Sequence, residues 1–366
     1  MVKILHTSDV QLDAPFHFLG VKGQQHRQQL RETFRRIVDM VAEAEFDLLV
    51  ITGDLFNDNR PHQDTVDFVV SQIGRLDIPV CILPGNHDCY DDTSVYRKAR
   101  FPDNAIIFTD QPTIREFAEL DVAVYGNAIL SSQSQRRPLR DLSPIGETRW
   151  HVAMAHGNVD RPDIDDPSRP IRLEEIRDSG MDYVALGDWH SFADYSQGEV
   201  AACYSGAPEP TAVDERGAGY VACIEIDENG VRVRPEQVGT ISTGEMSLDV
   251  SGKSVTQIME EIQARTDPNL MLKVTLSGLT DLGLVLDTEK LEQELFPHFY
   301  YIGCSDQSHP QLASISPDDF PEELVVGKFG RLMQARIEDA ADDIERRRAE
   351  QALQVGVALL KGRRVL

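Results

Sequence analysis

The sequence lacks any long hydrophobic run, and it has few cysteines. No stretch of about 18 consecutive apolar residues occurs in the chain, so no segment is long enough for a membrane-spanning helix. The first residues, MVKILHTSDV, lack the long apolar region of a signal peptide and predict a strand. The 5 cysteines are widely spaced without a Cys-x-x-Cys pair, which argues against a disulfide framework and a structural zinc site. We therefore expect a soluble, cytoplasmic protein with reduced thiols.

Basic residues are also scarce. The chain of 366 residues has 36 lysines and arginines against 61 aspartates and glutamates, a formal net charge of −25. This charge excludes general electrostatic attraction to nucleic acid or to an anionic membrane. A polyanionic substrate therefore requires a local basic patch or a bound metal ion. The hydrophobic content of 41% is ordinary for a globular protein, and the length predicts two or three domains.

Short apolar runs alternate with amphipathic stretches in the first part of the chain, which predicts an α/β fold with a sheet covered by helices. The expected elements are, in order, strand 2–5, helix 24–44, strand 48–52, helix 63–74 and strand 80–83. From residue 122 onward the apolar runs follow each other more closely, so the fold becomes richer in strands. We expect a main domain over 1–240, a small α+β domain over 241–315, and a helical segment over 316–366. In that segment we expect a helix over 329–349 and then a shorter one that ends in KGRRVL.

Polar side chains with metal-binding or acid–base chemistry follow five of the predicted strands. The segments are Ser8-Asp9-Val10-Gln11, Gly53-Asp54, Gly85-Asn86-His87-Asp88, Ala155-His156-Gly157 and Gly187-Asp188-Trp189-His190. Because open α/β sheets bind ligands at the carboxyl ends of their strands, we expect these side chains to lie together at one edge. A single aspartate at such a place often caps a helix, but five groups in order argue against that interpretation.

These residue types point to metal chemistry. Carboxylate, amide oxygen and imidazole together suit hard-to-borderline divalent ions such as Mn²⁺, Mg²⁺, Fe²⁺ and Zn²⁺. Two such ions about 3.5–4 Å apart stabilise both the attacking and the leaving oxygen of a phosphoryl transfer. The sequence therefore predicts a two-metal centre for phosphoryl transfer.

The same ordered series resembles the calcineurin-like metallophosphoesterases, whose pattern is DxH, GDxxD, GNHD, an isolated histidine and GHxH. The segments HTSDVQLDAPF and YSGAPEP further resemble the DNA-repair exonuclease branch of that superfamily, the SbcD and YhaO type. The resemblance covers residues 1–235. It implies a β-sandwich flanked by helices, with a small α+β cap domain and C-terminal helices.

The resemblance also implies roles for individual residues. Asp9 and His190 would hold the first metal ion, and Asp54 would bridge the two ions. The second ion would be held by Asn86 and His156. His87 would be the general acid and Asp88 would orient its ring, while a metal-bridging hydroxide would attack the phosphorus.

Three positions depart from the family pattern. Gln11 replaces the histidine of DxH, Asp188 replaces the first histidine of GHxH, and Asn57 replaces the second aspartate of GDxxD. We expect Gln11 and Asp188 to remain metal ligands. Their oxygen atoms favour Mn²⁺ first, with Mg²⁺ or Fe²⁺ as alternatives, over Zn²⁺. The alternative interpretation is that one metal site is lost.

The expected activity is that of a metal-dependent phosphodiesterase, a DNA exonuclease or endonuclease subunit in DNA repair. Two alternatives stay open at this point. One is a phosphodiesterase or phosphatase of the same fold that acts on small molecules. The other is a non-catalytic scaffold for an SMC-like ATPase.

Residues 16–18 and the apolar residues of the tail can each be interpreted in two ways. Residues 16–18, Phe-His-Phe, either shape a loop beside the substrate or pack within the domain. Apolar residues at helical spacing in the tail either pack within it or dock on a partner; they are Leu332, Ile337, Ile344, Leu353, Val357 and Leu360. The resemblance implies that this partner is an SMC-like ATPase. A homodimer also stays open.

Overall fold

The structure is a computed structural model that describes residues 1–109, 113–140, 142–160, 168–280, 286–310, 321 and 323–360. The chain divides into two compact units, Met1–Thr243 and Gly244–Leu366. This division lies close to the boundary that we expect at residue 240. The boundary expected at residue 315 and the last six residues, KGRRVL, lie outside the described residues. The three-domain organisation therefore stays a proposal.

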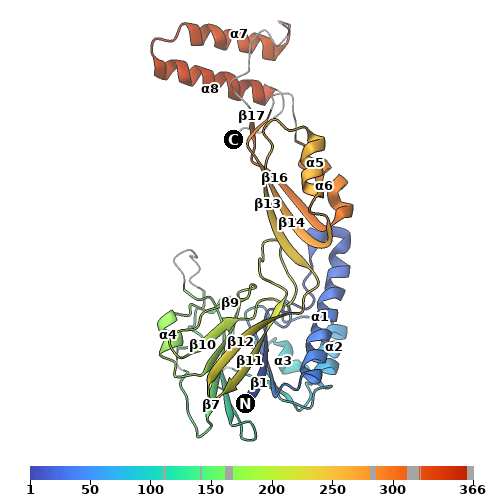
Figure 1. Cartoon of the computed structure of the whole chain (residues 1–366), viewed down its shortest axis with the longest axis vertical. Helices are drawn as coiled ribbons and strands as arrows, with labels where there is room; N and C mark the ends of the chain where they lie inside the picture. The colour runs from blue at the N-terminus through green and yellow to red at the C-terminus, as the bar shows by residue number, and fades with distance from the viewer. Residues whose placement is uncertain are drawn as a thin grey trace. The chain divides into compact units, whose positions relative to one another are not determined.

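One six-stranded sheet of the first unit carries the N-terminal strand (Figure 1). It contains β1 (Val2–Thr7), β2 (Leu48–Thr52), β3 (Val80–Leu83), β4 (Ala105–Ile107), β11 (Tyr220–Asp227) and β12 (Gly230–Gln237). Its strand order is β12-β11-β1-β2-β3-β4. Strands β1 to β4 run parallel, and β11 pairs antiparallel with β1. The carboxyl ends of β1, β2 and β3 consequently lie at one edge of the sheet.

The second sheet also has six strands. It contains β5 (Thr113–Phe117), β6 (Val122–Gly126), β7 (Trp150–His156), β8 (Tyr183–Gly187), β9 (Ala193–Asp194) and β10 (Ala201–Tyr204). Its order is β5-β6-β7-β8-β10-β9, and β6, β7, β8 and β10 are parallel. The inner faces of the two sheets share one core, in which Val50 and Ile224 of the first sheet pack with Val124 and Met154 of the second.

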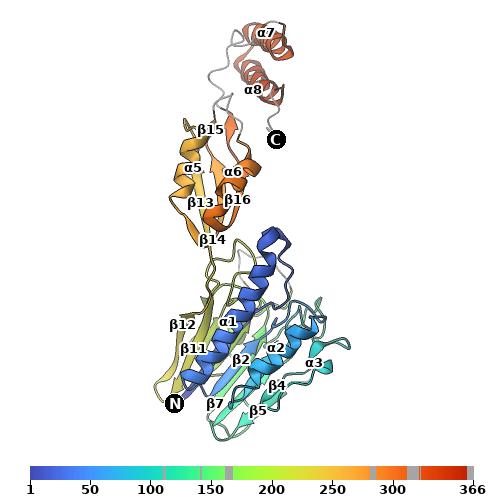
Figure 2. The ribbon, with the colours of Figure 1, turned by 90° about the vertical axis from the view of Figure 1, so that its right-hand side faces the viewer.

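Helices cover the other face of the first sheet (Figure 2). They are α1 (Gly23–Glu43) and α2 (Gln63–Ile73), within a residue of the predicted bounds. Helix α1 buries Leu30, Phe34, Ile37, Val38 and Val41, the apolar positions at helical spacing. Shorter helical segments of this unit are η1 (His17–Lys22), α3 (Val95–Lys98) and α4 (Leu173–Arg177). The predicted sandwich of sheets flanked by helices is confirmed.

The second unit contains an α+β segment with a three-stranded sheet of β13 (Ser242–Asp249), β14 (Asp267–Ser277) and β16 (Phe299–Asp306). Two short strands, β15 (Leu279–Thr280) and β17 (His309–Pro310), pair separately. Helices α5 (Val255–Gln263) and α6 (Thr288–Leu295), followed by η2 (Phe296–His298), complete the segment. Helix α5 begins at a capping box in which the Ser254 hydroxyl accepts from the Gln257 N–H.

The bounds expected for the first of the two tail helices, 329–349, are wrong, because the chain breaks earlier and the second helix begins at Asp343. Helix α7 spans Val325–Glu338 and α8 spans Asp343–Leu360. The Asp342 carboxylate accepts a hydrogen bond of 2.8 Å from the Glu345 backbone N–H and so caps the start of α8. The two helices pack through Met333, Leu353 and Val357. No described helix of the chain is long and apolar enough to span a bilayer.

Candidate metal centre

The loops after β1 and β2 are joined by backbone hydrogen bonds. The Asp9 N–H donates to the Gly53 carbonyl at 3.0 Å, and the Gln11 N–H donates to the Asp54 carbonyl at 2.9 Å. Asp9 and Asp54 both have a backbone φ of 53°. This is the left-handed region, which residues other than glycine adopt at a cost in free energy. Such conformations persist where the surrounding structure imposes them, and they are frequent at functional sites.

Two glycines let the ligand side chains approach the backbone. A Cβ atom on Gly53 would lie 2.0 Å from His156 Nδ1, and one on Gly85 would lie 2.1 Å from Asp54 Oδ1. Gly53 also has a φ of +86°. Any larger residue at either position would displace a predicted metal ligand, so the glycines of these strand ends are part of the site.

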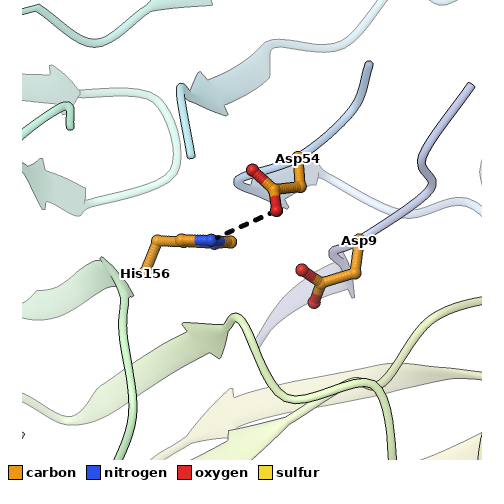
Figure 3. Close-up of side chains that lie close together, drawn as sticks. All are labelled: Asp9, Asp54 and His156. Carbon is orange, nitrogen blue, oxygen red and sulfur yellow. Dashed lines mark ion pairs between the residues drawn. The ribbon is translucent and has the colours of Figure 1, made fainter. Parts of the chain in front are cut away.

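Three buried side chains from three strand ends form the centre of the site (Figure 3). Asp9, Asp54 and His156 each offer one ligand atom, and these atoms lie within 4.8 Å of one another. His156 Nε2 is 3.5 Å from Asp54 Oδ2. A cluster of two carboxylates and one imidazole at this spacing is suited to a divalent cation.

The other four predicted ligands lie around this centre. Asn86 Oδ1 is 2.8 Å from His156 Nε2, and Gln11 Nε2 donates to Asp54 Oδ2 at 3.1 Å. Asp188 Oδ1 is 3.5 Å from His156 Nε2, and His190 Nε2 is 3.9 Å from Asp9 Oδ1. The structure therefore brings together side chains from all five strand ends.

The His156 ring is held by its far nitrogen. Its Nδ1 is 3.0 Å from the Thr52 carbonyl, so Nδ1–H donates and Nε2 points to the site. Nε2 faces oxygen atoms of Asn86, Asp54 and Asp188. Burial acts to lower the pKa of His156, but Asp54 and Asp188 outweigh it and raise that pKa well above its usual value. Because Nε2 and these oxygen atoms all carry lone pairs, a proton on Nε2 or a metal ion between them is needed to make their close approach favourable.

His190 is oriented by a residue that sequence reasoning missed. Its Nδ1 is 2.5 Å from Glu215 Oε1 and 3.0 Å from Thr211 Oγ1. Burial acts to lower the pKa of His190, but the hydrogen bond to Glu215 and the charge of Asp9 raise it to about 9. A carboxylate on the far nitrogen of a histidine is the usual support of a histidine that binds a metal ion.

The donor set fits divalent metal ions. Gln11 Oε1 is buried and has no hydrogen-bond partner among the described residues, and such an oxygen is costly unless something binds it. Burial raises the pKa of the Asp9 carboxyl to about 6, which means that its charge lacks full compensation in the protein alone. A cation at this centre would satisfy both groups.

Asp188 has a second partner that the sequence did not indicate. Arg169 is 5% exposed, and its Nη2 lies 3.2 Å from both oxygens of the Asp188 carboxylate. Burial acts to raise the pKa of Asp188, but His156 and Arg169 lower it to about 2. The pair of Asp188 and Arg169 carries no net charge, like the neutral histidine of the family pattern. Having Asp188 in place of histidine therefore adds no net negative charge to the centre, and the uncompensated carboxylates are those of Asp9 and Asp54.

His87 lies at the entrance, with 44% of its side chain exposed. Its backbone N–H donates to Asp54 Oδ1 at 2.9 Å, and its Nε2 is 4.0 Å from Asp54 Oδ2. Its Nδ1–H donates to the Asn57 carbonyl at 2.9 Å. The Nε2 atom of His87 therefore points toward the predicted metal ligands, where a general acid is needed.

The orienting role expected for Asp88 is corrected by its contacts. The buried Asp88 carboxylate accepts hydrogen bonds from the backbone N–H groups of Gly85 at 2.8 Å and Phe56 at 3.1 Å, and from the Tyr96 hydroxyl at 2.6 Å. Asp88 therefore fixes the turn that carries His87, and the Asn57 carbonyl orients the ring. Sequence adjacency suggested a direct contact, but the turn directs the Asp88 carboxylate inward.

We expect metal binding to release protons at neutral pH. A histidine must be neutral at the nitrogen that binds a metal ion, and the raised pKa values of His156 and His190 keep both rings protonated at pH 7.5 without metal. Titration calorimetry of Mn²⁺ at pH 7.5, in two buffers of different ionisation enthalpy, should show net proton release. The apparent affinity should also rise with pH up to about 9. The His190→Gln variant should release one proton fewer, and heats independent of buffer would contradict this account.

Comparison with known proteins agrees with this geometry. "Uncharacterized metallophosphoesterase YhaO" of Bacillus subtilis is 21% identical over 378 residues, which cover 93% of this chain and 90% of that protein. Two proteins named "DNA double-strand break repair protein Mre11" are also similar. The one from Methanosarcina mazei is 23% identical over 80% of this chain, and the one from Methanopyrus kandleri 27% over 75%. This chain spans 48% and 64% of their lengths.

Residues 2–192, more than half of the chain, match the family described as calcineurin-like phosphoesterase. Members of this family bind divalent metals, and the cluster of Asp9, Asp54 and His156 has the geometry to hold such an ion. The chain is a hydrolase that belongs to the calcineurin-like phosphoesterase family.

Proposed function

We propose that this protein is a metal-dependent phosphodiesterase that cleaves DNA, as an exonuclease or endonuclease subunit in DNA repair. The observation that carries the proposal is the meeting of seven predicted ligand side chains at the ends of five strands; they are Asp9, Gln11, Asp54, Asn86, His156, Asp188 and His190. The similarity to proteins named for DNA double-strand break repair supports DNA as the substrate.

We propose that two metal ions share Asp54. Asp9, Gln11 and His190 would hold the first ion, and Asn86, His156 and Asp188 would hold the second. When bound, such a pair supplies electrostatic stabilisation of the phosphoryl oxygens and lowers the pKa of water. Five of the seven ligands offer oxygen, which favours Mn²⁺, with Mg²⁺ or Fe²⁺ as alternatives.

The chain's own residues would position and transfer protons. His87 Nε2 would donate a proton to the leaving oxygen, while the Asn57 carbonyl keeps the proton on Nδ1. The Thr52 carbonyl and Glu215 would hold the His156 and His190 rings in place. Arg169 would keep the Asp188 carboxylate in position and offset its charge.

The C-terminal helices support a proposal about a partner. Leu353 and Val357 pack inside the α7–α8 pair, but Leu332 and Ile344 are each 65% exposed, and Leu360 is 47% exposed. We propose that these exposed apolar residues contact a helical partner, an SMC-like ATPase in the cytoplasm. Contacts with DNA phosphates need positive charge, and this chain has a net charge of −25. The partner would therefore supply the basic residues that bind DNA.

The net charge also favours a second candidate, a phosphodiesterase for small molecules, because a small substrate needs no extended basic surface.

One experiment separates the candidate functions. Purified protein loaded with Mn²⁺ is assayed with bis(p-nitrophenyl) phosphate, single- and double-stranded DNA, and a panel of cyclic and linear nucleotides at low salt. We expect hydrolysis of the first substrate and of DNA. Turnover of nucleotides without DNA cleavage would favour the small-molecule phosphodiesterase. Less than one bound metal ion per chain would favour the third alternative, a non-catalytic scaffold for an SMC-like ATPase.

A further inference from the structure

A pocket of about 300 Å³ opens beside the candidate metal centre, and this volume is typical of a site for a small ligand. Gln11, His87 and His190 are among the residues that line it. The segment Ala14–Phe18, which is apolar except for His17, also lines it and forms an apolar wall. We call this pocket the aromatic pocket. Whatever occupies it lies next to the phosphate that the metal ligands and His87 would act on.

The apolar wall is held in a defined conformation. Phe16 is 4% exposed and has a φ of 49°, in the left-handed region that an aromatic residue adopts at a cost. Its ring packs edge-on against His26 of α1 at 4.5 Å between centroids, and His26 Nε2 is 2.8 Å from the Pro210 carbonyl. The Arg27 side chain donates to the Pro15 carbonyl at 3.0 Å. The wall is therefore anchored to α1 from several directions.

Phe18 presents an aromatic surface to this pocket. It is 41% exposed, although its ring centroid lies only 6.4 Å from that of buried Phe16. A ligand in the pocket would therefore find part of the Phe18 ring accessible for contact. Aromatic side chains in nucleic-acid-binding sites stack on bases in this way, with about 1–3 kcal/mol per base.

The charges around the pocket favour stacking over phosphate contacts. No lysine or arginine is among the described residues that line it, and the whole chain carries a net charge of −25. Affinity for a nucleotide must therefore come from the metal centre, which binds phosphate, and from contacts without charge. A stacked base supplies such contacts, and it is available only where the strand is unpaired.

We propose that the aromatic pocket binds the base of an unpaired nucleotide whose phosphate lies at the metal centre. The proposal rests on the phosphodiesterase activity proposed above and adds a substrate class to it: nucleotide ends with a free base, in preference to base-paired or sugar-only phosphates. Phe18 is then a residue that determines specificity and takes no part in the chemical step.

The test compares two probes that differ only in the base. The affinities of dAMP and of 2-deoxyribose 5-phosphate for the protein loaded with Mn²⁺ are measured by titration calorimetry, and hydrolysis of bis(p-nitrophenyl) phosphate is measured separately. We expect dAMP to bind about 5- to 150-fold more tightly, as stacking of one base implies. In Phe18→Ala this preference should fall to below about twofold, and in Phe18→Trp it should persist.

The matched control is Val21→Ala, because Val21 lies in the same segment, is 87% exposed and does not line the pocket. It should keep the full preference for dAMP. Equal affinity of the wild-type protein for the two probes, or an unchanged preference in Phe18→Ala, would overturn the pocket proposal while hydrolysis of bis(p-nitrophenyl) phosphate is intact. Loss of that hydrolysis in the wild-type protein would instead overturn the proposed function.

Discussion

The Asp54→Asn variant should lose hydrolysis of bis(p-nitrophenyl) phosphate by about 10²- to 10³-fold, the size of effect known for removal of one preorganised electrostatic group. Asp54 is 2% exposed, and its carboxylate accepts from Gln11 Nε2 and the His87 backbone N–H. Asparagine keeps the size of the side chain but removes the charge that both proposed metal ions would share. Metal content should fall in the same variant, as measured by mass spectrometry after Mn²⁺ loading and desalting.

The control for this variant is Asp92→Asn, since Asp92 is an exposed carboxylate in the loop that follows His87. It should retain wild-type activity and metal content. Circular dichroism should show that both variants are folded. If Asp54→Asn hydrolyses the substrate at the wild-type rate, the metal centre is not the catalytic site.

Replacing His87 by alanine should separate acid catalysis from metal binding. A general acid contributes about 10²- to 10⁴-fold, and it matters most when the leaving oxygen is a poor leaving group. We therefore expect a large loss of kcat on a DNA phosphodiester and a smaller loss on bis(p-nitrophenyl) phosphate, whose leaving group needs little protonation. Metal content should stay unchanged, because His87 is not among the predicted ligands and its side chain is 44% exposed.

His62→Gln is the control for His87→Ala, because His62 is exposed and its side chain caps no helix. Its kinetics should equal those of the wild type on both substrates. An equal loss of kcat on the two substrates would mean that His87 contacts the phosphate without donating a proton. A loss of bound metal in His87→Ala would place the residue among the ligands instead.

The sequence correctly predicted which site residues lie together when those residues stand at the ends of regular strands. Asp9, Asp54 and Asn86 follow the parallel strands β1, β2 and β3, and His156 and Asp188 follow β7 and β8. Parallel pairing brings the strand ends together within each sheet, and the packing of the two sheets on a shared core brings the two edges together. The apolar runs that define these strands are visible in the sequence, so the grouping within each sheet was predictable without side-chain detail.

The supporting residues were not predictable by the same argument. Arg169 and Glu215 lie in irregular segments, and each reaches its partner through tertiary structure: Arg169 contacts Asp188, and Glu215 contacts His190. Among the 61 acids and 36 basic residues of the chain, no local pattern distinguishes these two. The position of the break between α7 and α8 was mispredicted for a related reason, because Asp342 acts as a cap only once the chain turns there.

The paired loops after β1 and β2 have a consequence for substitutions in the site. Backbone hydrogen bonds from Asp9 and Gln11 to residues 53 and 54 join the two loops through main-chain groups alone. The Asp9 and Asp54 side chains take no part in this pairing. Replacing either carboxylate should therefore leave the two loops joined, so that such a variant tests the chemistry of the side chain with the local backbone intact.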